Sequence, residues 1–276
     1  MTTVPADPAE SELVARLATA RERLLEELAK CIVGQRTALE QEGLRTSVCD
    51  LTGETSVESL AAAVLEAAPD RFALVGLSMG GIVALEVLRQ AGARVTHLAL
   101  LNSTPRADAA GDLRRAQLDR VARGGLAAVI IEELAPRYFA PSGATPERLA
   151  LVLDMAVSLG ASAFSRQTRA LAARRSYEGT LGAVACPTLV VGGTEDRVCP
   201  LDIQREMARA IPGARLVALE DCGHLSTIER PAEAARALLG FLTGTPRERS
   251  WTCRRGAASR RRSARAPEWT RGLEAT

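Results

Sequence analysis

A serine in a glycine-rich turn is the residue of this sequence best suited to covalent chemistry. Ser78 is the central residue of a Gly-x-Ser-x-Gly pattern at positions 76–80, where the apolar run 72–75 ends and a segment with helical spacing, 82–90, begins. In a strand, sharp turn and helix of this kind, the serine hydroxyl is lifted above the edge of a sheet. The glycines leave room for the neighbouring strand and helix. We interpret Ser78 as a nucleophile; the alternative is a serine that only caps the following helix.

A serine hydroxyl needs a base that takes its proton, and histidine has a suitable pKa near neutrality. The sequence contains two histidines. His97 lies within the apolar stretch 95–101, where a role in the core or at a surface edge is expected. His224 follows the strand-like segment 215–219 in a short loop. Open α/β sheets place functional groups in loops just past the strand ends, so His224 is the candidate base.

The base in turn needs an acid that orients it, and three acidic residues compete for this role. Asp196 lies in a loop after an apolar strand segment and precedes His224, and the order Ser, Asp, His is expected for this type of turn. Glu195 would point in a different direction from its neighbour. Asp221 is so close in sequence to the histidine that a side-on approach to the imidazole is awkward. The serine, the histidine and Asp196 predict a proton relay for attack on an acyl carbonyl.

Strands that alternate with helices would position these residues. Strand-like segments occur at residues 44–51, 72–75, 95–101, 188–191 and 215–219, and helical periodicity occurs at 36–43, 57–68 and 82–90. This alternation indicates an α/β fold with a mostly parallel sheet and helices on both faces.

A long insert without strand signals separates the third strand-like segment from the fourth. Helical segments are expected at 112–123, 126–135, 146–160 and 162–175. We interpret residues 105–183 as a helical cap over the catalytic end of the sheet. Several apolar side chains of the cap are candidates for the wall of an acyl pocket, although most are expected to pack helix against helix: Leu134, Tyr138, Phe139, Met155, Leu159 and Phe164.

Length and composition limit the classes of protein that fit. With 276 residues, 47% of them hydrophobic, the chain can bury a sizeable core in one or two domains. No apolar run approaches the ~20 residues of a bilayer span. Residues 1–10 lack the basic start and apolar middle of a signal peptide, so a cytoplasmic location without membrane contact is expected. The six cysteines have no metal-ligand spacing, which indicates reduced thiols. The oligomeric state stays open.

The end of the chain differs from the rest in charge. From Arg247 onward, nine arginines stand against three glutamates, among serine, alanine and glycine. This composition predicts that residues 243–276 form a basic, disordered tail. Such a run can attract nucleic acid electrostatically. Because the arginine-rich stretch 254–265 has no interleaved aromatic residue for base stacking, nucleic acid is not an expected partner.

Three motifs together resemble the α/β-hydrolase superfamily, in particular its small esterases. They are Gly-Leu-Ser-Met-Gly-Gly at 76–81, Gly-Thr-Glu-Asp-Arg-Val-Cys-Pro at 193–200 and Asp-Cys-Gly-His-Leu-Ser-Thr-Ile-Glu-Arg-Pro at 221–231. The resemblance extends over about residues 35–242. It implies an α/β-hydrolase fold whose core consists of residues 35–104 and 184–242.

The same resemblance implies a role for each residue of the motifs. Ser78 is the nucleophile, His224 is the general base and then the acid, and Asp196 orients the histidine. The backbone N–H of Met79 is one oxyanion-hole donor, because it follows the nucleophile at a helix N-terminus. The expected reaction is hydrolysis of a small carboxylic ester through an acyl-enzyme, without metal or organic cofactor. Lactone, thioester and C–C bond hydrolysis are alternatives within the same chemistry.

The N-terminal part departs from this family. Residues 1–34 are expected to form a helical segment, and residues 24–35 resemble the start of MoxR-type AAA ATPases. Lys30 is the single lysine of the chain and lies in no phosphate-binding loop, so nucleotide hydrolysis is excluded.

Family members carry an apolar strand and a glycine turn at this place, and the turn supplies a second oxyanion donor. Here residues 16–28 are charged and helical. The first strands of the fold are therefore expected to be missing. A catalytically impaired relative that only binds ligands is the alternative function.

Overall fold

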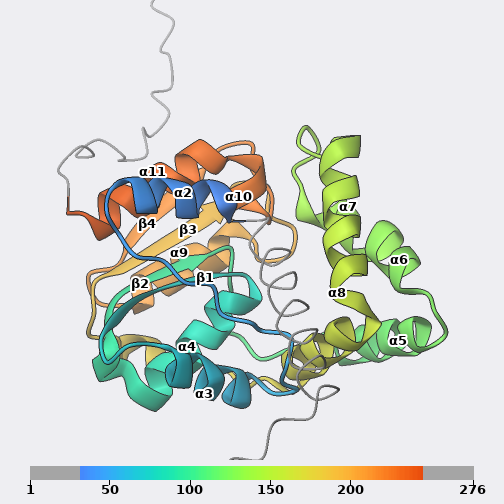
Figure 1. Ribbon diagram of the computed structural model, residues 1–276, viewed down its shortest axis with the longest axis horizontal. Coiled ribbons are helices and arrows are strands. Elements are labelled where there is room, and N and C mark those ends of the chain that lie inside the picture. Colours follow the sequence, from blue (N-terminus) through green and yellow to red (C-terminus); the bar gives the residue numbers. More distant parts are fainter. Residues whose placement is uncertain (1–31, 245–276) are drawn as a thin grey trace, which may run out of the picture.

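The computed structural model describes residues 32–244 (Figure 1). Residues 1–31 of the expected N-terminal helical segment, which include residues 24–31 of its MoxR-like stretch, and all but the first two residues of the basic tail lie outside these residues.

Four parallel strands form the sheet of the described residues, and they lie side by side in chain order. They are β1 (Phe72–Leu77), β2 (Val95–Leu101), β3 (Thr188–Gly193) and β4 (Arg215–Leu219). The register pairs Leu77 with Leu101 and Gly193 with Leu219. All four carboxyl ends therefore reach the same edge of the sheet, as parallel pairing requires.

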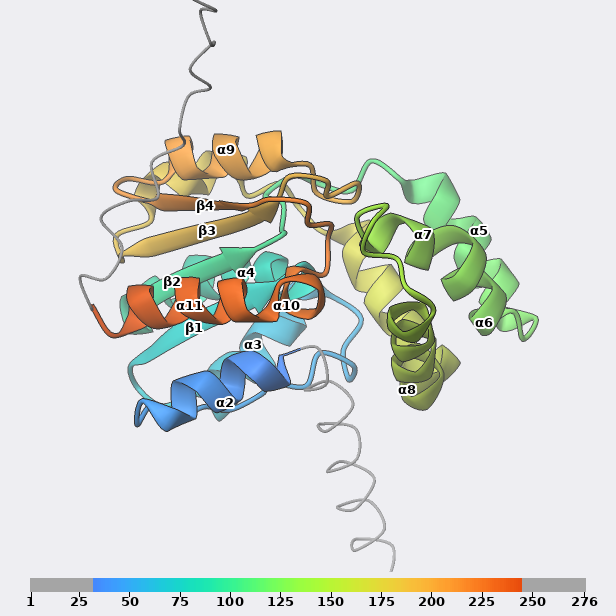
Figure 2. The ribbon, with the colours of Figure 1, turned by 90° about the horizontal axis from the view of Figure 1, so that it is seen from above.

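Helices cover both faces of this sheet, because its central strands are apolar on both sides. Along β2, Leu98 and Leu100 belong to one hydrophobic cluster, whereas Ala99 and Leu101 belong to another. The first cluster includes helices α3 (Val57–Ala67), α4 (Met79–Ala91) and α9 (Leu201–Ala210), and the second includes α11 (Pro231–Leu242), against which α2 (Val33–Gln41) packs (Figure 2). The predicted α/β fold with a parallel sheet and helices on both faces is confirmed. Short helices complete this part: η1 (Gly92–Arg94), η3 (Glu178–Ala183) and α10 (Ser226–Glu229).

The insert between β2 and β3 is helical and lies beside the carboxyl edge of the sheet (Figures 1 and 2). It consists of α5 (Gly111–Ala122), α6 (Leu126–Ala128), the π-helical η2 (Val129–Leu134), α7 (Ala135–Tyr138) and α8 (Pro146–Ala173). The helices share their own hydrophobic cluster. The two helices expected at 146–160 and 162–175 are both present within α8, which is kinked at Gly160, whose φ of 83° is not helical. The boundaries 105 and 183 of the cap stay predictions.

Helix α8 is long and apolar enough, by length and composition alone, to cross a membrane. In the structure it packs against α5 and α6. A single helix of this kind is weak evidence for a membrane span.

The strand expected at residues 44–51 is wrong: this segment is not part of the sheet. A strand persists where its backbone groups pair with a neighbour. No described strand pairs with the outer edge of β1, where Val75 is 41% exposed. Residues 51 and 52 instead accept hydrogen bonds at their carbonyls from Gln167 and Arg166 of α8. Elsewhere in the segment, Thr46 accepts a hydrogen bond from Arg36 of α2, and Cys49 and Leu51 pack against the core, so these contacts and those with α8 take the place of strand pairing.

Candidate active site

Ser78 lies at the turn between β1 and α4, in a backbone conformation that is rare for a residue with a side chain. Its φ is 51° and its ψ is −113°. The turn is fixed from β2, because the Ser78 N–H donates to the Leu101 carbonyl at 2.9 Å. A Cβ on Gly76 would collide with the Gly80 backbone, and one on Gly81 would collide with Ser103. Glycine is therefore required at both positions, because the neighbouring atoms lie too close for a side chain.

Gly80, the second glycine of the Gly-x-Ser-x-Gly pattern, is not crowded in this way. A Cβ on Gly80 would meet no atom within 4 Å. The interpretation that both glycines flanking the serine avoid collisions is therefore correct for Gly76 and wrong for Gly80.

His224 lies in the loop after β4 and is almost fully buried. Its Nε2 atom is 2.7 Å from the Ser78 Oγ. Its backbone N–H donates to the Tyr138 carbonyl at 2.8 Å, and the Tyr138 ring stacks on the imidazole with centroids 5.8 Å apart. The cap therefore contributes directly to the placement of the histidine.

Asp196, in the loop after β3, reaches the other side of the imidazole. Its carboxylate oxygens lie 3.1 and 3.0 Å from the His224 Nδ1. The backbone N–H groups of Val198 and Cys199 both donate to Oδ1 at 2.8 Å. Burial raises the pKa of Asp196, but the hydrogen bonds from His224, Asn102 and Cys199 outweigh it and hold the pKa below its usual value. The carboxylate is therefore ionised at neutral pH.

The three candidate residues thus form one continuous chain of hydrogen bonds. The rival groups lie elsewhere. Asp221 is 73% exposed and faces Arg230, and the His97 ring packs edge-on against Phe241. Glu195 makes a backbone hydrogen bond to Cys222, and no contact joins its carboxylate to the imidazole.

Asn102 is a residue of this site that the sequence patterns do not single out. It follows β2, is fully buried and has a φ of 47°. Its Nδ2 donates to Asp196 Oδ2 at 3.0 Å and to the Gly223 carbonyl at 3.1 Å, while its Oδ1 accepts from the Ser226 hydroxyl. One amide thus joins the aspartate loop to the histidine loop. Its position directly after a strand, at the same edge as the other loops, was the available signal.

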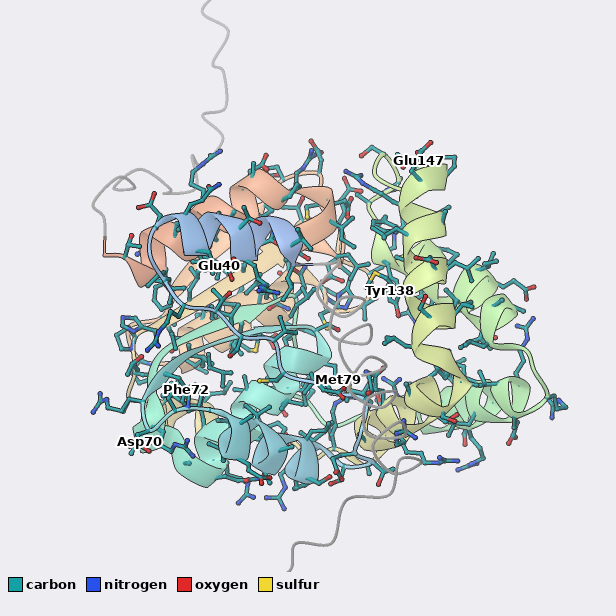
Figure 3. The ribbon with its side chains drawn as sticks, viewed as in Figure 1. Glu40, Asp70, Phe72, Met79, Tyr138 and Glu147 are labelled. Atoms are coloured by element: carbon teal, nitrogen blue, oxygen red, sulfur yellow. The ribbon has the colours of Figure 1, made fainter. Side chains whose placement is uncertain are left out.

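Met79 is the first residue of α4, and its N–H lies in a helical turn whose amides have no intrahelical acceptor. The helix dipole adds positive potential at this point. Met79 and Tyr138 both lie where the core meets the cap helices (Figure 3). Within residues 32–244, no group of three His, Cys, Asp or Glu side chains is arranged to hold a metal ion.

Comparisons with known proteins agree with this architecture. A family model described as "Alpha/beta hydrolase family" matches residues 34–237. The chain is 30% identical over 211 residues to the "Putative non-heme bromoperoxidase BpoC" of Mycobacterium tuberculosis, covering 69% of this chain and 75% of that protein. It is 30% identical over 218 residues to the "Putative carbamate hydrolase RutD" of Variovorax paradoxus, covering 74% and 80%. Among solved structures, a thermophilic esterase from Thermogutta terrifontis superposes with a TM-score of 0.70 at 28% identity, covering 78% of this chain and 85% of the esterase.

Proposed function

The chain belongs to the α/β-hydrolase family, and from that premise we propose that it is a serine hydrolase that cleaves a small carboxylic ester through an acyl-enzyme. The observation that carries the proposal is the hydrogen-bonded series from the Ser78 Oγ through the His224 imidazole to the Asp196 carboxylate. The similarity to an esterase supports the choice of an ester, whereas the relatives named for other substrates support only the broader class of hydrolase.

In the first half of the reaction, His224 Nε2 takes the proton from the Ser78 hydroxyl as Oγ attacks the acyl carbonyl. The negative charge that develops on the carbonyl oxygen is stabilised by the Met79 N–H and the N-terminus of α4. As the C–O bond to the alcohol breaks, the imidazolium returns its proton to the leaving oxygen. The ionised Asp196 stabilises the imidazolium while this charge exists.

In the second half, water replaces the alcohol. His224 takes a proton from the water as its oxygen attacks the acyl carbonyl, and then protonates Ser78 as the acid leaves. Every proton moves through one imidazole, and no step needs a cofactor.

Labelling with a fluorophosphonate tests the nucleophile. The full-length protein is expected to react at Ser78, and Ser78→Ala is expected to remain unlabelled and to lose hydrolysis of short-chain p-nitrophenyl esters. Loss of the nucleophile removes the largest part of the rate enhancement, on the order of 10⁶ in kcat. A folded wild-type protein that does not label would favour the alternative, a relative that only binds ligands. The reason to keep that alternative is the outer edge of β1. None of the described strands lies there, although family members are expected to carry the second oxyanion donor after such a strand.

A further inference from the structure

Glu229, the last residue of α10, has a buried carboxylate that the proposed reaction does not use. It is only 4% exposed. Its Oε2 accepts a hydrogen bond from the Gly223 N–H at 2.8 Å, and its Oε1 accepts one from the Ala140 N–H at 3.0 Å. No cationic side chain of residues 32–244 forms an ion pair with it. Since burial of a charged group is costly, these two amides must provide the compensation.

The two amides belong to different parts of the molecule. Gly223 precedes His224 in the loop after β4, whereas Ala140 follows α7 at the point where the chain runs on towards α8. The carboxylate thus bridges the cap and the histidine loop.

Further contacts hold the same two segments together. The Tyr138 carbonyl accepts hydrogen bonds from the N–H groups of His224 and Leu225, at 2.8 and 3.1 Å. A Cβ on Gly223 would collide with the backbone of residues 139 and 140. The two stretches of backbone are therefore in direct contact.

Helix α8 contributes Arg148 to the same region. Arg148 donates to the carbonyls of Gly143 and Glu229, at 2.9 and 3.2 Å. A Cβ on Gly143 would collide with the Glu229 carboxylate, so this loop also rests on the glutamate.

We propose that Glu229 is a positioning residue for His224: its carboxylate couples residues 138–140 of the cap to the histidine loop and so places the imidazole between serine and aspartate. This inference rests on the proposed function of the site. Displacement of a catalytic group by about 1 Å can cost 10²-fold in rate. A carboxylate suits this task because both of its oxygens accept hydrogen bonds. A glutamine has nearly the same shape but would turn an N–H₂ group towards one of the two N–H donors.

The test compares full-length wild type, Glu229→Gln and Glu220→Gln. Glu220 is an exposed carboxylate shortly before the same loop, and the same change there controls for loss of charge. Active sites are counted by complete fluorophosphonate labelling, and ester hydrolysis is expressed as kcat per labelled site. We expect Glu229→Gln to lower kcat per site by about 10- to 100-fold with KM little changed, because the imidazole and not the substrate is displaced. Glu220→Gln is expected to match the wild type.

An unchanged kcat per site in a folded Glu229→Gln protein overturns the inference, as does a loss explained entirely by fewer labelled sites. If this variant does not fold, Glu229→Asp is measured instead, since it keeps two acceptor oxygens but withdraws them by one methylene. A failure of both variants to fold would assign Glu229 to stability alone. Absence of labelling in the wild type is a different result, because it contradicts the proposed function itself.

Discussion

At the scale of single residues, Asp196 has a proposed catalytic role and a structural role that is visible in its hydrogen bonds, and pH can separate the two. Its buried carboxylate accepts hydrogen bonds from two backbone amides and from Asn102, besides its contact with His224. Replacing it by asparagine keeps the shape of the side chain but turns an N–H₂ group towards some of these N–H donors. It also removes the negative charge that stabilises the imidazolium. We expect Asp196→Asn to lower kcat at pH 7 by about 10⁴-fold.

The lowered pKa of Asp196 predicts how stability depends on pH. Folding favours the ionised carboxylate, so its contribution to the free energy of unfolding is fully present above the unfolded-state pKa, about 4. That contribution is lost as the pH falls through the lower pKa of the folded state. Denaturant unfolding should therefore show a large difference between wild type and Asp196→Asn at pH 7 and a smaller one at pH values below about 3. A difference that stays constant or grows in acid would contradict this assignment.

The residues that support the site show the limit of prediction from patterns. Ser78, Asp196 and His224 are found by type, order and position after strands. Asn102 and Glu229 act through contacts with residues more than eighty positions away, such as Asp196 and Ala140. No local spacing encodes those distances. The sequence offers only indirect signals for these two residues: the asparagine directly follows a strand, and the glutamate lies within the motif at 221–231.

At the scale of elements, the turn at Ser78 depends on its two crowded glycines and not on the third. Because a Cβ on Gly76 would overlap the Gly80 backbone, Gly76→Ala is expected to lower the free energy of unfolding by about 1–3 kcal/mol or more. Gly80→Ala meets open space in the first turn of α4 and is expected to leave stability unchanged or to raise it by at most about 1 kcal/mol. Thermal and denaturant unfolding of both variants provide the comparison. Equal destabilisation by the two alanines would show that the motif requires glycine for another reason.

The strands themselves were predictable from their apolar composition. Strands β1 to β4 are short apolar runs bounded by turn residues, and all four lie at or close to the expected positions. The strand expected at residues 44–51 does not form, and the reason lies in its surroundings rather than in its own sequence. Its alternating pattern fits a strand, but pairing depends on a neighbour that the described chain does not provide. Local pattern therefore predicts which segments are able to pair, whereas the neighbours decide whether they do.

At the scale of the whole molecule, the cap joins the core where the chain leaves β2 and returns towards β3. The Tyr177 N–H donates to the Pro105 carbonyl across this junction. Close by, the buried Asp108 carboxylate lies 3.1 Å from the Arg174 guanidinium and 2.6 Å from that of Arg114. Burial lowers the pKa of Arg174, and the Asp108 carboxylate opposes this shift. One acidic side chain thus ties α5 and the end of α8 to the start of the cap.

Removing that carboxylate should loosen the cap. Asp108→Ala leaves the buried Arg174 without its counter-charge, and we expect it to lower the free energy of unfolding by about 3–5 kcal/mol. The matched control is Asp112→Ala, which breaks an ion pair with Arg115 whose side chains are 98% and 74% exposed; such pairs contribute little. Denaturant unfolding gives the energies, and limited proteolysis locates the change, with earlier cleavage in residues 105–183 expected only for Asp108→Ala. Because residues 138–140 of the cap hold the His224 loop, ester hydrolysis should fall in the same variant. A variant that unfolds more easily yet shows neither new cleavage in the cap nor reduced hydrolysis would show that this junction does not control the active site.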